Sequence, residues 1–180
     1  MKLDDFCKLN NGFDTEAIRN AMEYAAECHI GTNQKYDNHP YTIHLKMVYD
    51  YGCKFSHLLH NEEFEPVLAA CWTHDTIEDT RQTYNDVKKR CGYEVAEIVY
   101  ALTNEKGRTR EERANDKYYN GIRALETATF VKLCDRLANF SYSVAHNQRM
   151  ADIYRNELPH FKQMLYNERF KPMFDLLETF

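Results

Sequence analysis

The chain has 180 residues, which suits one domain with a substantial hydrophobic core, so we expect residues 1–180 to form a single domain. Apolar residues make up 43% and charged residues 28%, a balance that excludes an intrinsically disordered chain. The net charge of −5 argues against a nucleic-acid-binding protein, which would need a basic surface.

Apolar residues recur at helical spacing from the start of the chain. The first helix is expected to begin near Asp14-Thr15 and to end at about His29, before Gly31. A second helix is expected to start at Pro40, and a third to cover about Glu63 to Thr73. His74 would then emerge where the apolar face of the third helix ends.

The second half of the chain continues the helical pattern. Thr83 and Asp86 resemble a capping box that opens a short helix, which Cys91-Gly92 would close. The segment 104–117 is polar and is expected to combine an exposed loop with the start of a helix. Further helices are expected over 93–102, 127–144 and 148–165, with a short one near the end.

Glycine and proline number only six and four, which disfavours a turn-rich β-protein, and no strand stands out. The expected fold class is therefore all-α, an irregular helical bundle. The six cysteines form no C-x-x-C pair, the N-terminus has no apolar signal core, and no segment could span a membrane. We expect reduced thiols in a cytoplasmic protein that does not bind membranes.

Four polar positions lie beside apolar helical faces: His44, the pair His74-Asp75, and Asp135. Taken singly, each has an ordinary explanation, because a lone histidine is usually packed in the core and aspartates often cap helices. Together they would bury two carboxylates, which is costly unless a cation neutralises them. Mixed nitrogen and oxygen ligands suit Mn, Fe, Mg or Zn, and a metal-bound water supplies hydroxide near neutral pH.

These positions fall within three longer motifs: Pro40-Tyr41-Thr42-Ile43-His44, His74-Asp75-Thr76-Ile77-Glu78-Asp79-Thr80, and Lys132-Leu133-Cys134-Asp135-Arg136-Leu137-Ala138-Asn139. The set resembles the HD superfamily of phosphohydrolases. Within that superfamily it is most similar to the hydrolase domain of RelA/SpoT-type alarmone enzymes and to the stand-alone small alarmone hydrolases. The resemblance covers roughly residues 25–144.

The resemblance implies a helical bundle of the HD-domain type, one Mn²⁺ ion, and removal of the 3′-pyrophosphate from guanosine tetra- or pentaphosphate, a small-molecule nucleotide. It also implies that Glu78 and Asp79 are catalytic, one activating water and one assisting proton transfer, in an order left open. The implied metal ligands are His44, His74, Asp75 and Asp135, and the expected substrate-binding residues are Lys35, Tyr41, Asn139 and Arg110.

Two departures from the family pattern leave the base open between guanine and adenine. Lys35-Tyr36 stands where the family usually has Arg-Lys, and Phe140-Ser141-Tyr142 replaces Met-Arg-Thr. The basic residues Lys106, Arg108, Arg110 and Arg113 could neutralise substrate phosphates or could simply form a solvated face.

Two alternatives remain beside the alarmone hydrolase. One is an HD-type phosphatase that acts on an adenosine alarmone, a deoxynucleotide or a phosphorylated dinucleotide cofactor. The other is a nucleotide-binding protein without catalysis. The oligomeric state is left open.

Overall fold

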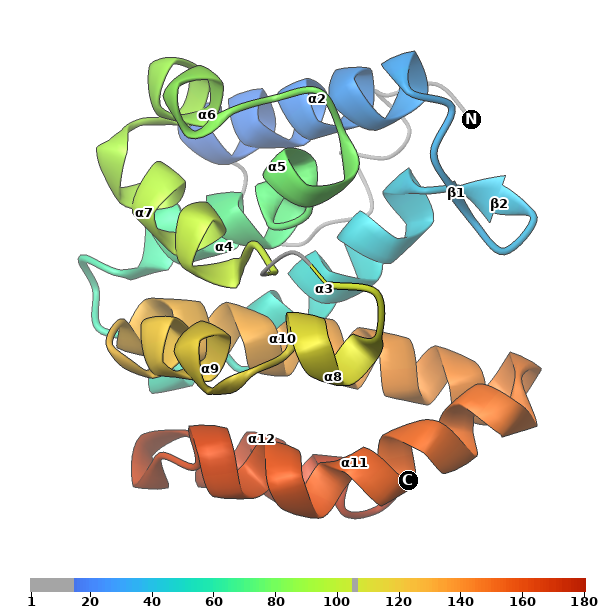
Figure 1. The fold of residues 1–180 in the computed structure, drawn as a ribbon. Helices are drawn as coiled ribbons and strands as arrows, with labels where there is room; N and C mark the ends of the chain where they lie inside the picture. Colours follow the sequence, from blue (N-terminus) through green and yellow to red (C-terminus); the bar gives the residue numbers. More distant parts are fainter. Residues whose placement is uncertain (1–14, 105–106) are drawn as a thin grey trace.

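The computed structural model describes residues 15–104 and 107–180. Asp14 and Lys106, which were considered above, lie outside this part of the chain, as does Cys7, one of the six cysteines. Apart from one short hairpin, the described regular structure is helical (Figure 1), so the expected all-α class is confirmed.

The first half of the fold consists of short helices and the hairpin. Thr15 caps the first of these helices by accepting a hydrogen bond from the backbone N–H of Ile18. The capping box of Thr83 and Asp86 is present, and Gly92, with a φ of 94°, ends the helix that the box begins. In chain order the elements are α2 (Glu16–Gly31), β1 (Lys35–Tyr36), β2 (His39–Pro40), α3 (Thr42–Lys54), η1 (Ser56–Leu58), α4 (Phe64–Thr73), α5 (Thr76–Asp79), α6 (Tyr84–Cys91) and α7 (Tyr93–Leu102).

The second half contains the two longest described helices. Its elements are α8 (Arg110–Arg113), α9 (Asp116–Arg123), α10 (Glu126–His146), α11 (Gln148–Leu165), η2 (Glu168–Phe170) and α12 (Lys171–Leu177). Helix α10 is central, since it packs against α3, α4, α7 and α9 as well as against α11 and α12 (Figure 1).

The core forms around α10 because its apolar residues repeat at helical spacing. Phe130, Leu133, Leu137 and Phe140 are completely buried, and Trp72 of α4 is 2% exposed. Burying each large apolar side chain contributes about 1.5–3 kcal/mol. A polar side chain on α10 that faces this core is therefore held in a rigid, water-poor setting.

The expected start of the second helix at Pro40 is wrong, because a hairpin occupies this position. Pro40 lies in β2, paired with Lys35, and α3 begins at Thr42. Asp37 adopts a φ of 51° at the turn, a conformation that aspartate tolerates better than most residues. Strands of two residues are too short to show an alternating pattern, so periodicity does not reveal them.

Two further expectations concern the thiols and the membrane. All five described cysteines are free, and Cys71 and Cys134 are buried. Among the described residues, no helix has both the length and the hydrophobicity that crossing a bilayer requires.

Candidate metal centre and active-site cavity

Three helices and one turn bring the four expected metal ligands together. His44 lies in the first turn of α3, His74 follows the last residue of α4, Asp75 lies between α4 and α5, and Asp135 lies in the middle of α10. His44, His74 and Asp135 are buried, with exposed fractions of 1%, 3% and 9%, and Asp75 is partly exposed. The cluster therefore sits where the apolar core meets an opening.

The donor atoms of these side chains are close to one another. The Nε2 atoms of His44 and His74 are 3.3 Å apart. His74 Nε2 lies 2.9 Å from Asp75 Oδ2, and His44 Nε2 lies 3.3 Å from Asp135 Oδ1. Within the described residues, His44, His74 and Asp75 make the only group of three side chains with metal-ligand spacing, and Asp135 borders it.

The histidine geometry fits a cation. His74 Nδ1 lies 3.1 Å from the backbone oxygen of Cys71, and donation to that oxygen leaves the Nε2 lone pair directed at the cluster. Because His44 Nε2 faces the same point, the two nitrogens require a proton or a metal ion between them.

The carboxylates of Asp75 and Asp135 are also stabilised by nearby positive charge. Burial alone would raise the pKa of Asp135, but the Lys132 ammonium and the hydrogen bond with His44 hold it below its ordinary value. The pKa of Asp75 is likewise lowered, against the effect of burial, by His74 and His44. Burial alone would lower the pKa of His44, yet Asp135 and Asp75 raise it to about 9, so a proton occupies the cluster when no cation does.

Taken together, two imidazoles and two ionised carboxylates form a donor set that suits a divalent cation. This donor chemistry does not by itself distinguish Mn²⁺ from other such cations.

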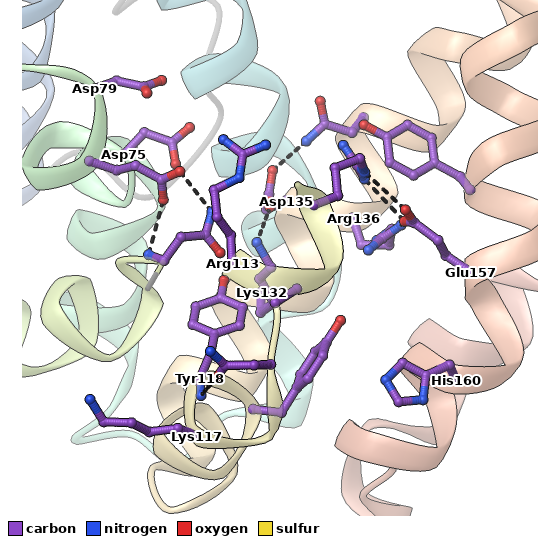
Figure 2. Close-up of a pocket in the computed structure, with 18 of the residues that line it drawn as sticks. Asp75, Asp79, Arg113, Lys117, Tyr118, Lys132, Asp135, Arg136, Glu157 and His160 are labelled. Atoms are coloured by element: carbon purple, nitrogen blue, oxygen red, sulfur yellow. Dashed lines mark hydrogen bonds and ion pairs between the residues drawn. The ribbon is translucent and has the colours of Figure 1, made fainter. Parts of the chain in front are cut away.

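A cavity of about 1000 Å³ opens beside the cluster. Figure 2 shows Asp75 and Asp79 on one side of it and Arg136 and Glu157 on the opposite side, with Lys132 and Asp135 between them. The expected substrate-binding residues Tyr41, Asn139 and Arg110 line the cavity, as do Glu78 and Asp79. Lys35 does not, because neighbouring strand residues point to opposite sides: Lys35 is exposed and Tyr36 faces inward.

Glu78 and Asp79 have different surroundings although they are adjacent in α5. Glu78 is exposed and accepts hydrogen bonds from the side chain of Asn104, at 2.7 Å, and from its backbone N–H, at 3.2 Å. Asp79 is partly buried and accepts a hydrogen bond from Gln34 at 3.2 Å. Burial, together with the charges of Asp75 and Glu78, raises the pKa of Asp79 to about 6, so Asp79 can hold a proton close to neutral pH.

Tyr41 and Asn139 connect the cavity wall to the cluster. The Tyr41 hydroxyl donates to Asp75 Oδ2 at 2.5 Å, and the Asn139 side-chain N–H donates to Asp135 Oδ1 at 2.5 Å. Burial and nearby carboxylates raise the pKa of the Tyr41 hydroxyl, which therefore remains a donor.

The far wall of the cavity is a network of two guanidinium groups and one carboxylate. Arg110 donates two hydrogen bonds to Glu157, at 2.9 and 3.1 Å, and Arg136 donates one at 2.8 Å. Both arginines also lie over the ring of Tyr154. Two cations around one carboxylate leave this wall with a net positive charge that suits a phosphate group.

Sequence reasoning did not single out several residues that line the cavity. Lys132 could have been found, because it lies three residues before Asp135 on the same helix and donates to it at 2.9 Å. Arg136 directly follows Asp135 on that helix, whereas three further lining residues come from other elements and carry no local signal: Asn104, Glu157 and His160.

Comparisons with known proteins agree with this geometry. The family profile described as "HD domain" matches residues 21–163. A Xenopus tropicalis protein named guanosine-3′,5′-bis(diphosphate) 3′-pyrophosphohydrolase MESH1 is 29% identical over 132 residues, which cover 70% of this chain and 69% of that protein. A guanosine-3′,5′-bis(diphosphate) 3′-pyrophosphohydrolase from Aquifex aeolicus is 34% identical over 129 residues, which cover 69% of this chain and 17% of the longer enzyme.

The fold has a counterpart among solved structures. A structure titled "A metazoan ortholog of SpoT hydrolyzes ppGpp and plays a role in starvation responses" superimposes with a TM-score of 0.69 and 21% identity. The superposition covers 93% of this chain and 97% of that one. The architecture of this bundle is therefore shared along almost the whole length of both chains.

Proposed function

Because this chain belongs to the HD-domain family, we propose that it is a metal-dependent hydrolase that removes the 3′-pyrophosphate from guanosine tetra- or pentaphosphate. The observation that carries the proposal is the convergence of His44, His74, Asp75 and Asp135 beside a cavity that also contains Glu78 and Asp79. Relatives whose names state this activity support the choice of substrate.

The four ligands would be His44, His74, Asp75 and Asp135, and the preferred ion would be Mn²⁺. When bound, such an ion lowers the pKa of a coordinated water and offsets the negative charge of the substrate phosphates. Tyr41 and Asn139 would hold Asp75 and Asp135 in place through the hydrogen bonds described above.

Two adjacent carboxyl groups would divide the proton transfers. Water attacks the phosphorus linked to the 3′ oxygen, the bond between that phosphorus and the 3′ oxygen breaks, and pyrophosphate leaves intact. Glu78, oriented by Asn104, would accept the proton from water. Asp79 would give its proton to the departing 3′ oxygen. Its pKa, raised to about 6, leaves a fraction of this carboxyl group protonated near neutral pH.

The far end of the cavity would bind the remaining phosphates of the nucleotide. Arg110 and Arg136 supply guanidinium groups there, where both are bound to Glu157. The cavity volume of about 1000 Å³ is at the upper end of the range for small-molecule sites, which suits a nucleotide with phosphates at two positions.

The test uses metal-free protein reconstituted with Mn²⁺ and a panel of guanosine and adenosine nucleotides that carry a 3′-pyrophosphate. We expect pyrophosphate release from guanosine tetraphosphate. Release of orthophosphate from a deoxynucleotide or a phosphorylated dinucleotide, without turnover of the panel, would favour an HD-type phosphatase of another specificity. Nucleotide binding without hydrolysis under any divalent metal would favour a non-catalytic protein.

A further inference from the structure

Tyr36, on the short hairpin, contacts one of the four proposed ligands directly and reaches a second through Asn139. Its ring is stacked on the imidazole of His44, with centroids 4.9 Å apart and planes inclined by 14°. Its hydroxyl donates at 3.0 Å to Asn139 Oδ1, and the amide N–H of Asn139 donates to Asp135. Since Asp135 Oδ1 lies 3.3 Å from His44 Nε2, the four side chains form a closed circuit of contacts.

The ring contact matters because His44 lacks the usual support of a metal-binding histidine. Such a histidine normally donates its second ring N–H to a carboxylate, carbonyl or water, which orients the ring. The Nδ1 atom of His44 is buried and has no hydrogen-bond partner among the described residues, whereas Nδ1 of His74 has the Cys71 carbonyl. The orientation of His44 therefore depends on ring packing, and Tyr36 supplies the only parallel contact among the described residues.

The hydroxyl contact matters because a side-chain amide can present either end to its neighbour. An amide oxygen turned toward Asp135 would repel the carboxylate, whereas the N–H attracts it. The Tyr36 hydroxyl is the donor in its 3.0 Å contact with Asn139. A donor at Tyr36 requires the oxygen of Asn139 to face it, and the N–H then faces Asp135.

These contacts point toward the site rather than toward general packing. The other three residues of the hairpin strands, Lys35, His39 and Pro40, are exposed, so the hairpin buries little of its own surface. Tyr142 of α10 contacts the Tyr36 ring edge-on at 4.8 Å and steadies it from the side.

We propose that Tyr36 is a positioning residue of the metal centre, whose ring orients His44 and whose hydroxyl, through Asn139, orients Asp135. The inference rests on the proposed function, because it concerns how tightly these ligands hold their ion.

The test measures the affinity of Mn²⁺ alone for chelator-stripped protein by titration calorimetry. Tyr36→Leu removes both contacts and is expected to weaken binding by at least about tenfold, the range found when supporting residues of metal ligands are lost. Tyr36→Phe keeps the ring and is expected to weaken binding by a smaller factor. That smaller factor should disappear in an Asn139→Ala background, because the hydroxyl acts through Asn139.

Two tyrosines elsewhere in the fold provide matched controls. Tyr84→Phe removes a hydroxyl that donates to Glu97 at 2.5 Å, and Tyr100→Leu removes a ring that is 62% exposed. Neither residue lines the cavity, and neither change is expected to alter Mn²⁺ affinity.

The inference is overturned if folded Tyr36→Leu binds Mn²⁺ as tightly as the parent. It is also overturned if Tyr36→Phe still weakens Mn²⁺ binding by the same factor in the Asn139→Ala background. If Tyr36→Leu does not fold by circular dichroism, the comparison of Tyr36→Phe with and without Asn139 decides alone. A parent protein that binds Mn²⁺ and releases pyrophosphate while the Tyr36 variants bind normally refutes this inference and leaves the proposed function standing. A parent that neither binds Mn²⁺ nor hydrolyses the nucleotide refutes both.

Discussion

The imidazoles of His44 and His74 meet edge to edge, with their Nε2 atoms 3.3 Å apart and their planes inclined by 62°. Both rings are buried, and each Nε2 also lies within 4 Å of the carboxylates of Asp75 and Asp135. Lone pairs and carboxylates cannot be packed this closely without positive charge among them. The convergence of α3, α4 and α10 is therefore tied to the binding of a proton or a metal ion.

Removal of one carboxylate should disable the centre. Asp135→Ala is expected to abolish detectable Mn²⁺ binding and to lower turnover by more than about 100-fold, beyond the effect of residues that only support ligands. Calorimetric titration and pyrophosphate release measure the two effects. Asp152→Ala, which removes an exposed carboxylate paired with Arg155 on α11, is the control and should retain both properties. Full activity in Asp135→Ala would refute the site.

Metal should stabilise the folded protein, because the assembled ligand cluster exists only in the native state. At a free Mn²⁺ concentration about 100 times the dissociation constant, the expected gain is about 2.7 kcal/mol. For a chain of this length, that gain corresponds to a rise in Tm of roughly 5–10 °C, measured by calorimetry with and without chelator. The prediction fails if added Mn²⁺ leaves the Tm of the parent unchanged and Asp135→Ala has that same Tm. Such a result would contradict a native metal site.

The pKa of Asp79 predicts a pH-dependent stability. In the unfolded chain this carboxyl has its ordinary pKa of 3.8, and in the folded protein burial and the charges of Asp75 and Glu78 raise the value to about 6. Between these two pH values the folded state therefore binds more protons than the unfolded state. The stabilisation of the folded state by the protonated Asp79 carboxyl is present below about pH 4 and is lost as the pH rises to about 6.

Asp79→Asn removes this ionisation. Urea unfolding in the presence of chelator should show the variant to be more stable than the parent above pH 6 and to have no such advantage at pH 4. Asp50→Asn, on the exposed side of α3, should change stability little at either pH. If Asp79→Asn has the same effect at both pH values, the raised pKa is excluded as the cause. The variant should nevertheless hydrolyse the nucleotide more slowly, because the proposed proton donor is lost.

Arg110 should affect binding more than chemistry, because it lies on the far wall of the cavity, bound to Glu157. Arg110→Ala is expected to raise KM roughly tenfold with little change in kcat, since charged hydrogen bonds contribute about 1.5–3 kcal/mol and Arg110 must first leave Glu157. Steady-state kinetics provide the measurement. Arg123→Ala, which removes an exposed arginine of α9 outside the cavity, is the matched control. An unchanged KM for Arg110→Ala would mean that Arg110 only holds α8 against α11.

Most helices were predictable because their signals are local. The expected helices over 93–102 and 148–165 match α7 and α11 at both ends, and the capping box at Thr83 begins α6 as expected. The hairpin was missed because its strands have two residues each, and Pro40 is as compatible with the start of a helix as with an edge strand. Helix α5 was also missed, since four residues cannot display a helical period.

The amino-acid sequence alone determined the helical class and the types of side chain that gather at the centre, because apolar spacing, caps and short motifs act within one helix or turn. Only the tertiary structure decided what surrounds those side chains. Glu157 reaches the cavity through the packing of α11 against α10, and Tyr36 meets His44 and Asn139 through the fold of the hairpin, 103 residues from Asn139 along the chain. Contacts of this kind depend on how distant elements pack, and no local pattern of residues encodes that packing.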